Sequence, residues 1–251
     1  MIAGSTLLLT AGLGLVALLY AAVGHAGASG YIAVLALAGL PASEIKPLAL
    51  LLNTAVAAVG CCTFLRAGHW PGRRFWPVYA LAVPAAFFGG AWTLPADWFR
   101  RLVAVVLLLS AWRLGRQNQD PDELRVPPAS LLAVTGGALG LLAGLTGTGG
   151  GVFLSPVLLL CRWCSTRQAA AVAVVFILLN SVAGLAGLVL VRPAAVTAVL
   201  QPHLLLWLAV VLPAGAVGSR LGSRHLPVAW LRRCLAVVLL LAGWKLLGVL
   251  R

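Results

Sequence analysis

Apolar residues gather along this chain into runs that glycine, proline and arginine separate. Several runs approach the roughly 20 apolar residues that a helix needs to cross a bilayer. In the first half the runs are Ser5 to Val23, Tyr31 to Leu40, Leu48 to Leu65, Trp76 to Leu94 and Trp98 to Leu114. In the second half they are Ala129 to Leu145, Val152 to Leu160, Ala169 to Val191, Leu204 to Val217 and Trp230 to Leu247. The second run of each half is too short to span, which predicts a short re-entrant or broken helix there.

The stretch from Arg113 to Pro128 interrupts this pattern because it is long and polar. It predicts a solvated linker over residues 117–128, between a first membrane repeat over residues 1–116 and a second over residues 129–251. Hydrophobic residues make up 62% of the 251 positions and charged residues only 9%, whereas soluble domains carry about 25% charged residues. The chain is therefore predicted to be an all-α, polytopic membrane protein surrounded by the lipid bilayer.

One segment occurs twice, first from Leu94 as LPADWFRRLVAVVLLLSAWRL and again from Leu226 as LPVAWLRRCLAVVLLLAGWKL, with 13 of 21 positions identical. Further matches are Asn53 with Asn180 at an offset of 127, and Ala28 to Gly30 with Gly149 to Gly151 at an offset of 121. We therefore predict two homologous halves with five membrane segments each. The tryptophan and paired arginines of the repeated segment are interpreted as interfacial anchors.

The net charge of +13 comes from 18 lysines and arginines against five acidic residues. These basic residues lie in short loops and at the ends of apolar runs, where they set topology rather than bind nucleic acid. Five membrane elements per half put twelve basic residues on one face and six on the other, whereas four crossings per half give nine and nine. The positive-inside rule favours the first arrangement. It predicts inverted repeats, with both chain ends outside the cytoplasm and the linker inside.

Between the first and second runs of each half lies a glycine-rich break, Gly24 to Gly30 in the first and Gly147 to Gly151 in the second. Glycine disfavours helix, so the backbone should unwind there. Unwound backbone at membrane depth is tolerated inside protein or around a water-filled cavity, and the helix that follows presents an N-terminus that binds anions. Two such ends near the bilayer midplane predict an anion site; close helix packing is the alternative use of the glycines.

The candidate substrate-binding residues lie in these breaks or in the matched third runs. They are His25, Gly27, Ala28, Ser29, Gly30, Asn53, Thr148, Gly149, Gly150, Gly151 and Asn180. Each asparagine either donates to a substrate oxygen or ties an unwound loop to its neighbour. His25 is either a proton relay or anion partner, or a structural histidine.

No catalytic residue, cofactor or metal site is expected. All five acidic residues fall at segment ends or in loops, so no buried carboxylate offers a sodium or proton site. The five cysteines form no obvious disulfide framework. Cys161 and Cys164 have the CxxC spacing of redox and zinc sites, but no second pair completes a zinc site.

Two rival functions stay open beside transport. Residues Gly27 to Gly30 spell GASG, which fits the GxSG nucleophile motif of intramembrane serine proteases, with Ser29 as the nucleophile. Such an enzyme needs a histidine base on another membrane helix. The other rival is an accessory membrane protein that transports nothing.

The motif GTGGGVFLSPVLLL from Gly147, its degenerate counterpart GASGYIAVLALAGLP from Gly27 and the Asn-Thr and Asn-Ser pairs resemble the TauE/SafE family of sulfite and organosulfonate exporters. The resemblance implies a permease of the bacterial inner membrane for small sulfur-containing anions such as sulfite or sulfonates. We expect the anion between the two breaks, moved by alternating access. Tryptophan-rich faces between Trp70 and Trp98 fit either a homodimer or an aromatic belt.

Overall fold

The computed structural model describes residues 2–92, 108, 111, 112, 116, 120, 123–200 and 202–246, and its regular elements are helices. The first half contains α1 (Ile2–Ala22), α2 (Ala28–Leu37), α3 (Ala42–Arg66), the 3-10 turn η1 (Arg73–Phe75) and α4 (Trp76–Ala91). The second half contains α6 (Ala129–Thr146), α7 (Gly151–Leu160), α8 (Thr166–Val191), α9 (Pro193–Thr197), α10 (Pro202–Arg220), the π-helical turn η2 (Leu221–His225) and α11 (Val228–Leu246).

The predicted helices are confirmed within this part of the chain, including the two short ones, since α2 and α7 have ten residues each. Most of the fifth predicted segment, Trp98 to Leu114, lies outside the described residues. Among the described helices, four have the length and apolar composition to cross a membrane: Ser43–Arg66, Ala129–Thr146, Thr166–Val191 and Pro202–His225. The protein is therefore all-helical, with several apolar helices suited to a bilayer.

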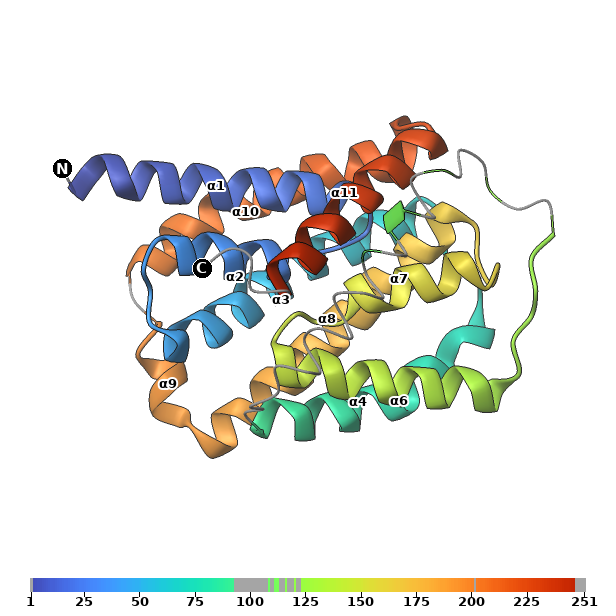
Figure 1. Cartoon of the computed structure of the whole chain (residues 1–251), viewed down its shortest axis with the longest axis horizontal. Coiled ribbons are helices and arrows are strands. Elements are labelled where there is room, and N and C mark those ends of the chain that lie inside the picture. The colour runs from blue at the N-terminus through green and yellow to red at the C-terminus, as the bar shows by residue number, and fades with distance from the viewer. Residues whose placement is uncertain are drawn as a thin grey trace.

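Two outer pairs of helices flank the molecule, and each pair joins one helix from each half (Figure 1). In the first pair a Cβ at Gly218 of α10 would overlap the backbone carbonyl of Leu18 on α1, and one at Gly222 would overlap that of Ala22. Residue numbers rise together along both helices, so α1 and α10 run parallel. Glycine at such contacts lets the two backbones approach closely, as is common between membrane helices.

The second outer pair, α4 and α6, repeats this arrangement. Gly136 of α6 lies against the carbonyl of Val78, and Gly140 lies against that of Ala82. These helices are therefore also parallel to each other. The first helix of each half thus packs beside the helix that forms the fourth apolar run of the other half, which is the pairing expected of two related halves that exchange partners.

The third helix of each half forms the centre of the molecule, where α3 and α8 cross between the outer pairs (Figure 1). Asn53 hydrogen-bonds Ser181, whereas Gly60, two turns later on α3, faces Val174, which is earlier on α8. The two helices are therefore antiparallel. The matched helices α3 and α8 run in opposite directions through the molecule.

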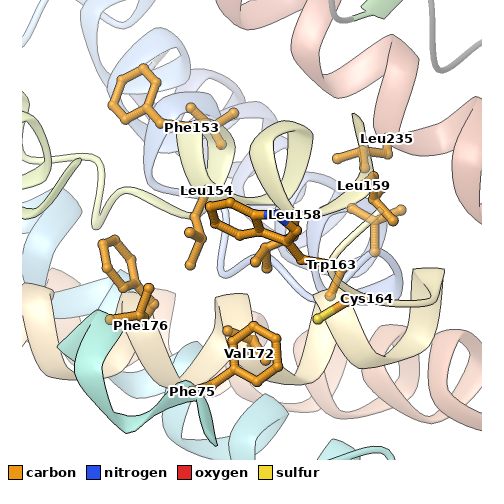
Figure 2. Close-up of a cluster of buried hydrophobic side chains, with 14 of the residues drawn as sticks. Phe75, Phe153, Leu154, Leu158, Leu159, Trp163, Cys164, Val172, Phe176 and Leu235 are labelled. Atoms are coloured by element: carbon orange, nitrogen blue, oxygen red, sulfur yellow. The ribbon is translucent and has the colours of Figure 1, made fainter. Parts of the chain in front are cut away.

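Buried apolar side chains fix the short helix α7 in this frame. Figure 2 shows Leu154 and Leu158 of α7 pointing toward Phe176 and Val172 of α8, with Trp163 from the following turn between them. Both leucines are fully buried. This packing holds the start of α7, and the glycine break before it, in one place against α8.

The start of α8 is tied to the linker and to α11. Ser165 and Gln168 form a capping box. The backbone N–H of Thr166 donates to Asp120 Oδ1 at 2.8 Å, and Arg232 Nη2 lies 3.0 Å from the same oxygen. Arg232 is 1% exposed, so the interpretation of this arginine as an interfacial anchor is wrong. It is a buried cation neutralised by a linker carboxylate.

Candidate functional site

The two glycine breaks have the same backbone framework. Gly27 before α2 (φ 101°) and Gly150 before α7 (φ 81°) both adopt the left-handed conformation that favours glycine. Three residues earlier, Gly24 (φ 76°) and Gly147 (φ 71°) match in the same way. The breaks therefore correspond at an offset of 123, not at the offset of 121 that composition had indicated. His25 is then equivalent to Thr148.

An asparagine side chain caps the helix that follows the first break, although the buried Nδ1 of His25 in this break has no hydrogen-bond partner. The backbone N–H of Ala28, the first residue of α2, donates to Asn53 Oδ1 at 3.1 Å, and Asn53 Nδ2 donates to Ser181 Oγ at 2.8 Å. Asn53 has no exposed surface. Its amide therefore caps α2 and also links α3 to α8. The sequence allows either substrate contact or a structural link for Asn53, and these hydrogen bonds fit the structural link.

His25 and Ser29 of the first break also have protein partners. His25 Nε2 lies 3.3 Å from Ser155 Oγ of α7, so this histidine bridges the two halves. Ser29 Oγ donates to the Tyr20 hydroxyl at 3.1 Å. In this geometry His25 contacts Ser155 and not Ser29, so the serine–histidine pair that a protease needs is absent at Ser29 among the described residues. Gly30 packs against the Val16 side chain.

The second break is backed closely by α8 and α3. A Cβ at Gly149 would overlap Asn53 Nδ2 and lie 2.8 Å from Ser181 Oγ. One at Gly150 would lie 2.7 Å from the Phe176 ring, and one at Gly151 would overlap Ile177. No side chain fits at these three positions, so the backbone itself lines this place.

The Thr148 hydroxyl forms a hydrogen bond with the neighbouring Thr146 hydroxyl. Thr146 Oγ1 donates to the Leu142 carbonyl at 2.7 Å and lies 2.8 Å from Thr148 Oγ1. Because Thr146 has only one hydroxyl proton, Thr148 is the donor in the second bond. The Thr148 side chain then holds the shape of the break, and its hydroxyl proton is already in use.

The backbone N–H groups of the second break differ from the Thr148 hydroxyl in their hydrogen bonding. Phe153 and Leu154 N–H both donate to the Gly150 carbonyl at 3.0 Å, as in an ordinary first turn. In the described structure, none of the N–H groups of residues 148–152 donates to a protein acceptor. Consecutive free N–H groups around left-handed residues form a concave anion-binding surface. The N-terminus of α7 adds its own partial positive charge.

Asn180 is the one buried asparagine of the described residues with a free amide. It is 1% exposed, yet neither Oδ1 nor Nδ2 has a hydrogen-bond partner. On α8 it lies one turn after Phe176, which contacts Gly150, and one turn before Gly184, which lies near Gly144. Residues four apart share a helix face, so Asn180 faces the segment between Gly144 and Gly150, which contains the end of α6 and the start of the second break.

Lys46 is a residue near the site that the sequence reasoning assigned only to topology. A Cβ at Gly147 would lie 3.0 Å from Lys46 Cγ, so the lysine stem lines the second break. Its position at the start of a long helix gave no sign of this contact, because the contact depends on how α3 packs beside α6 and α4. A lysine near the start of α3, where the Asn53–Asn180 match places Ala173 in α8, was the available signal.

The CxxC cysteines do not form a reactive pair. All five cysteines are free, with Cys161 exposed and Cys164 fully buried. Burial raises the pKa of the Cys164 thiol to about 12, so this thiol stays protonated and unreactive at neutral pH. In the part of the chain that the structure describes, no group of three or more His, Cys, Asp or Glu side chains is arranged to hold a metal ion.

Known proteins share similarity with nearly the whole chain. The model of the family described as sulfite exporter TauE/SafE matches residues 8–246. The chain belongs to the TauE/SafE family. It is also 40% identical over 237 residues to the probable membrane transporter protein y4hK of Sinorhizobium fredii, covering 92% of this chain and 94% of that relative. No solved structure matches the chain.

Membership of the TauE/SafE family agrees with the apolar helices described above. This TauE/SafE chain is a multi-pass membrane protein of the transporter class, and its family and relative indicate a transporter rather than an enzyme. A small-molecule substrate follows from that class.

Proposed function

We propose that this protein carries small sulfur-containing anions, such as sulfite or sulfonates, across the bacterial inner membrane by alternating access. The observation that carries the proposal is the set of free backbone N–H groups at residues 148–152. Each unsatisfied polar group at membrane depth costs several kcal/mol. An oxyanion satisfies several of them together, and its charge is stabilised by the N-terminus of α7.

The Asn180 amide supports the same site independently of the backbone. A buried amide without a partner loses about 1–3 kcal/mol relative to a satisfied one. Its Nδ2 supplies a donor of the type that a sulfite or sulfonate oxygen accepts. We assign substrate contact to Gly149, Gly150, Gly151 and Asn180, and assign the other candidates, His25, Gly27, Ala28, Ser29, Gly30, Asn53 and Thr148, to the frame that holds them.

We propose inverted repeats of five membrane segments for the two halves. The antiparallel packing of α3 against α8 supports this arrangement. Val56 faces Gly215 and His69 hydrogen-bonds Ser223, so α3 and α10 are parallel and their last turns, with Arg66 and Arg220, lie at one face. By the positive-inside rule this face is cytoplasmic. Rocking of the halves then exposes the second break to each side in turn.

The exposed tryptophans suit this placement. Trp76 and Trp92 stand at the two ends of α4 and are 56% and 68% exposed. Tryptophan is enriched at both membrane interfaces. We assign these two side chains to the aromatic belts; a homodimer stays a prediction.

The test is flux of sulfite, sulfoacetate, taurine and thiosulfate in proteoliposomes, with and without a pH gradient. We expect at least one anion to move faster than in protein-free liposomes. Gly150→Leu should abolish that flux, because the side chain would collide with Phe176 and a left-handed φ disfavours leucine. Absence of flux for all four compounds in the folded wild-type protein would overturn the proposed function.

A further inference from the structure

Lys46 places a positive charge at the mouth of the second break. Its stem lines Gly147, and its Nζ lies 3.2 Å from the Gly90 carbonyl and 3.3 Å from the Trp92 carbonyl. These carbonyls end α4, where the helix dipole is negative. The ammonium is thus held where α3, the end of α4 and the α6–α7 break meet.

The charge of Lys46 has no counter-ion among the described residues. It forms no ion pair with a described carboxylate, and the charged residue that acts on it is Arg192, a second cation. Arg232, by contrast, has a counter-ion, because Asp120 Oδ1 lies 3.0 Å from its guanidinium. Lys46 is partly buried and Arg192 is exposed, and a partly buried cation near a like charge is costly unless an anion joins it. An ammonium also has three donors, of which the two carbonyls use two.

The other half lacks this charge at the equivalent place. Gly24 corresponds to Gly147, and the residue that Gly24 contacts on α8 is Ala170, whose Cβ and backbone it meets directly. Residues 23–28 are all buried there. At the second break Thr146, Thr148 and Lys46 are only partly buried. Residues 147 and 149–152 are themselves buried, so Lys46 is the charged group at the partly exposed edge of this break.

We propose that Lys46 is a specificity-determining residue of this transporter: at the mouth of the second break its ammonium receives oxyanions that carry a net negative charge and favours them over zwitterionic sulfonates. This inference rests on the proposed function, because it assigns selectivity to the same site. Because Arg192 adds a second positive charge nearby, the binding affinity for dianions such as thiosulfate increases most. Taurine carries its own ammonium group and gains least.

The test compares thiosulfate and taurine uptake by Lys46→Gln in proteoliposomes. Glutamine keeps an NH₂ group that donates to the α4 carbonyls and removes only the charge. We expect the KM for thiosulfate to rise about tenfold, equivalent to about 1.4 kcal/mol, with kcat and the KM for taurine nearly unchanged. Arg66→Gln, the same charge change at the exposed far end of α3, is the matched control and should leave both KM values unaltered.

A second variant tests whether the lost charge, rather than a folding defect, raises the KM for thiosulfate. Lys46→Cys modified with an aminoethyl thiosulfonate regains a positive charge and should regain a low KM for thiosulfate, whereas a sulfonatoethyl reagent should not restore it. The wild-type protein receives both reagents as the control for its own exposed cysteines. An unchanged thiosulfate KM in Lys46→Gln, an equal rise in Arg66→Gln, or equal effects of both reagents would overturn the assignment of Lys46 alone. Absence of all flux in the wild type would instead overturn the proposed function.

Discussion

The two glycine breaks have the same backbone framework and different surroundings. At the first, Asn53 caps the N–H of Ala28 and Ala170 packs directly on Gly24, so a side-chain amide satisfies the start of α2 and α8 fills the space beside the break. At the second, the N–H groups of residues 148–152 and the Asn180 amide have no protein partner in the described structure. A duplicated motif has thus become one structural joint and one candidate binding site. The difference shows that repetition locates a site without telling which copy performs the function.

The largest expected effect comes from filling the second break. Gly149→Ala puts a methyl group onto Asn53 Nδ2, at a position whose φ of 69° already disfavours alanine. We expect anion flux in proteoliposomes to fall to the level of protein-free liposomes. Gly68→Ala is the matched control, because its φ is 78° but no atom lies within 4 Å of the added carbon. Normal flux in Gly149→Ala would contradict the role of this break.

The two asparagines should separate stability from transport. Asn53→Ala leaves Ala28 N–H and Ser181 Oγ without partners and should lower the free energy of unfolding by about 2 kcal/mol. Asn180→Ala breaks no protein hydrogen bond, so it should change stability by less than about 0.5 kcal/mol and raise the KM for the anion about tenfold. Thermal unfolding in detergent and flux kinetics measure the two effects. The opposite assignment of effects would mean that Asn53 is the substrate ligand.

The two half-buried or buried cations offer a similar contrast. Arg232→Gln removes the cationic partner of Asp120 and the hydrogen bond from Arg232 Nε to Thr166 Oγ1, which should destabilise the protein by about 3 kcal/mol. Lys46→Gln removes a charge without a counter-ion and should leave the unfolding temperature unchanged or higher. Equal destabilisation by both variants would show that Lys46 has a hidden structural partner.

The smallest effect on transport is expected at Ser29. Ser29→Ala removes one hydrogen bond to Tyr20, which contributes about 1 kcal/mol, and should leave anion flux close to the wild-type rate. A proteolytic activity of the purified protein that this variant abolishes would instead favour the intramembrane protease.

The described helices and the glycine breaks followed from the pattern of apolar and glycine residues, because membrane helices need long apolar runs and glycine disfavours helix. The register between the breaks did not follow. Composition aligned Ala28-Ser29-Gly30 with the three glycines, whereas the left-handed N-cap position aligns Gly27 with Gly150. Local composition does not show which of several glycines adopts a positive φ.

The chemical difference between the breaks depends on packing between distant segments. Asn53 and Asn180 are equivalent in the sequence, but only Asn53 meets an N–H donor and a hydroxyl. Lys46 reaches Gly147 across about 100 positions of the chain, and Arg232 meets Asp120 across 112. Charge counting placed both cations at helix ends. It carried no information on which of them has a counter-ion.

Hydrogen–deuterium exchange measured by mass spectrometry tests the central claim most directly, because that claim concerns backbone N–H groups. Peptides that cover residues 146–154 and residues 23–31 are compared with and without sulfite or thiosulfate at concentrations that support flux. We predict slower exchange at residues 148–152 when the anion is present and no change in the first break. Protection of the first break alone, or of neither break, would contradict the account.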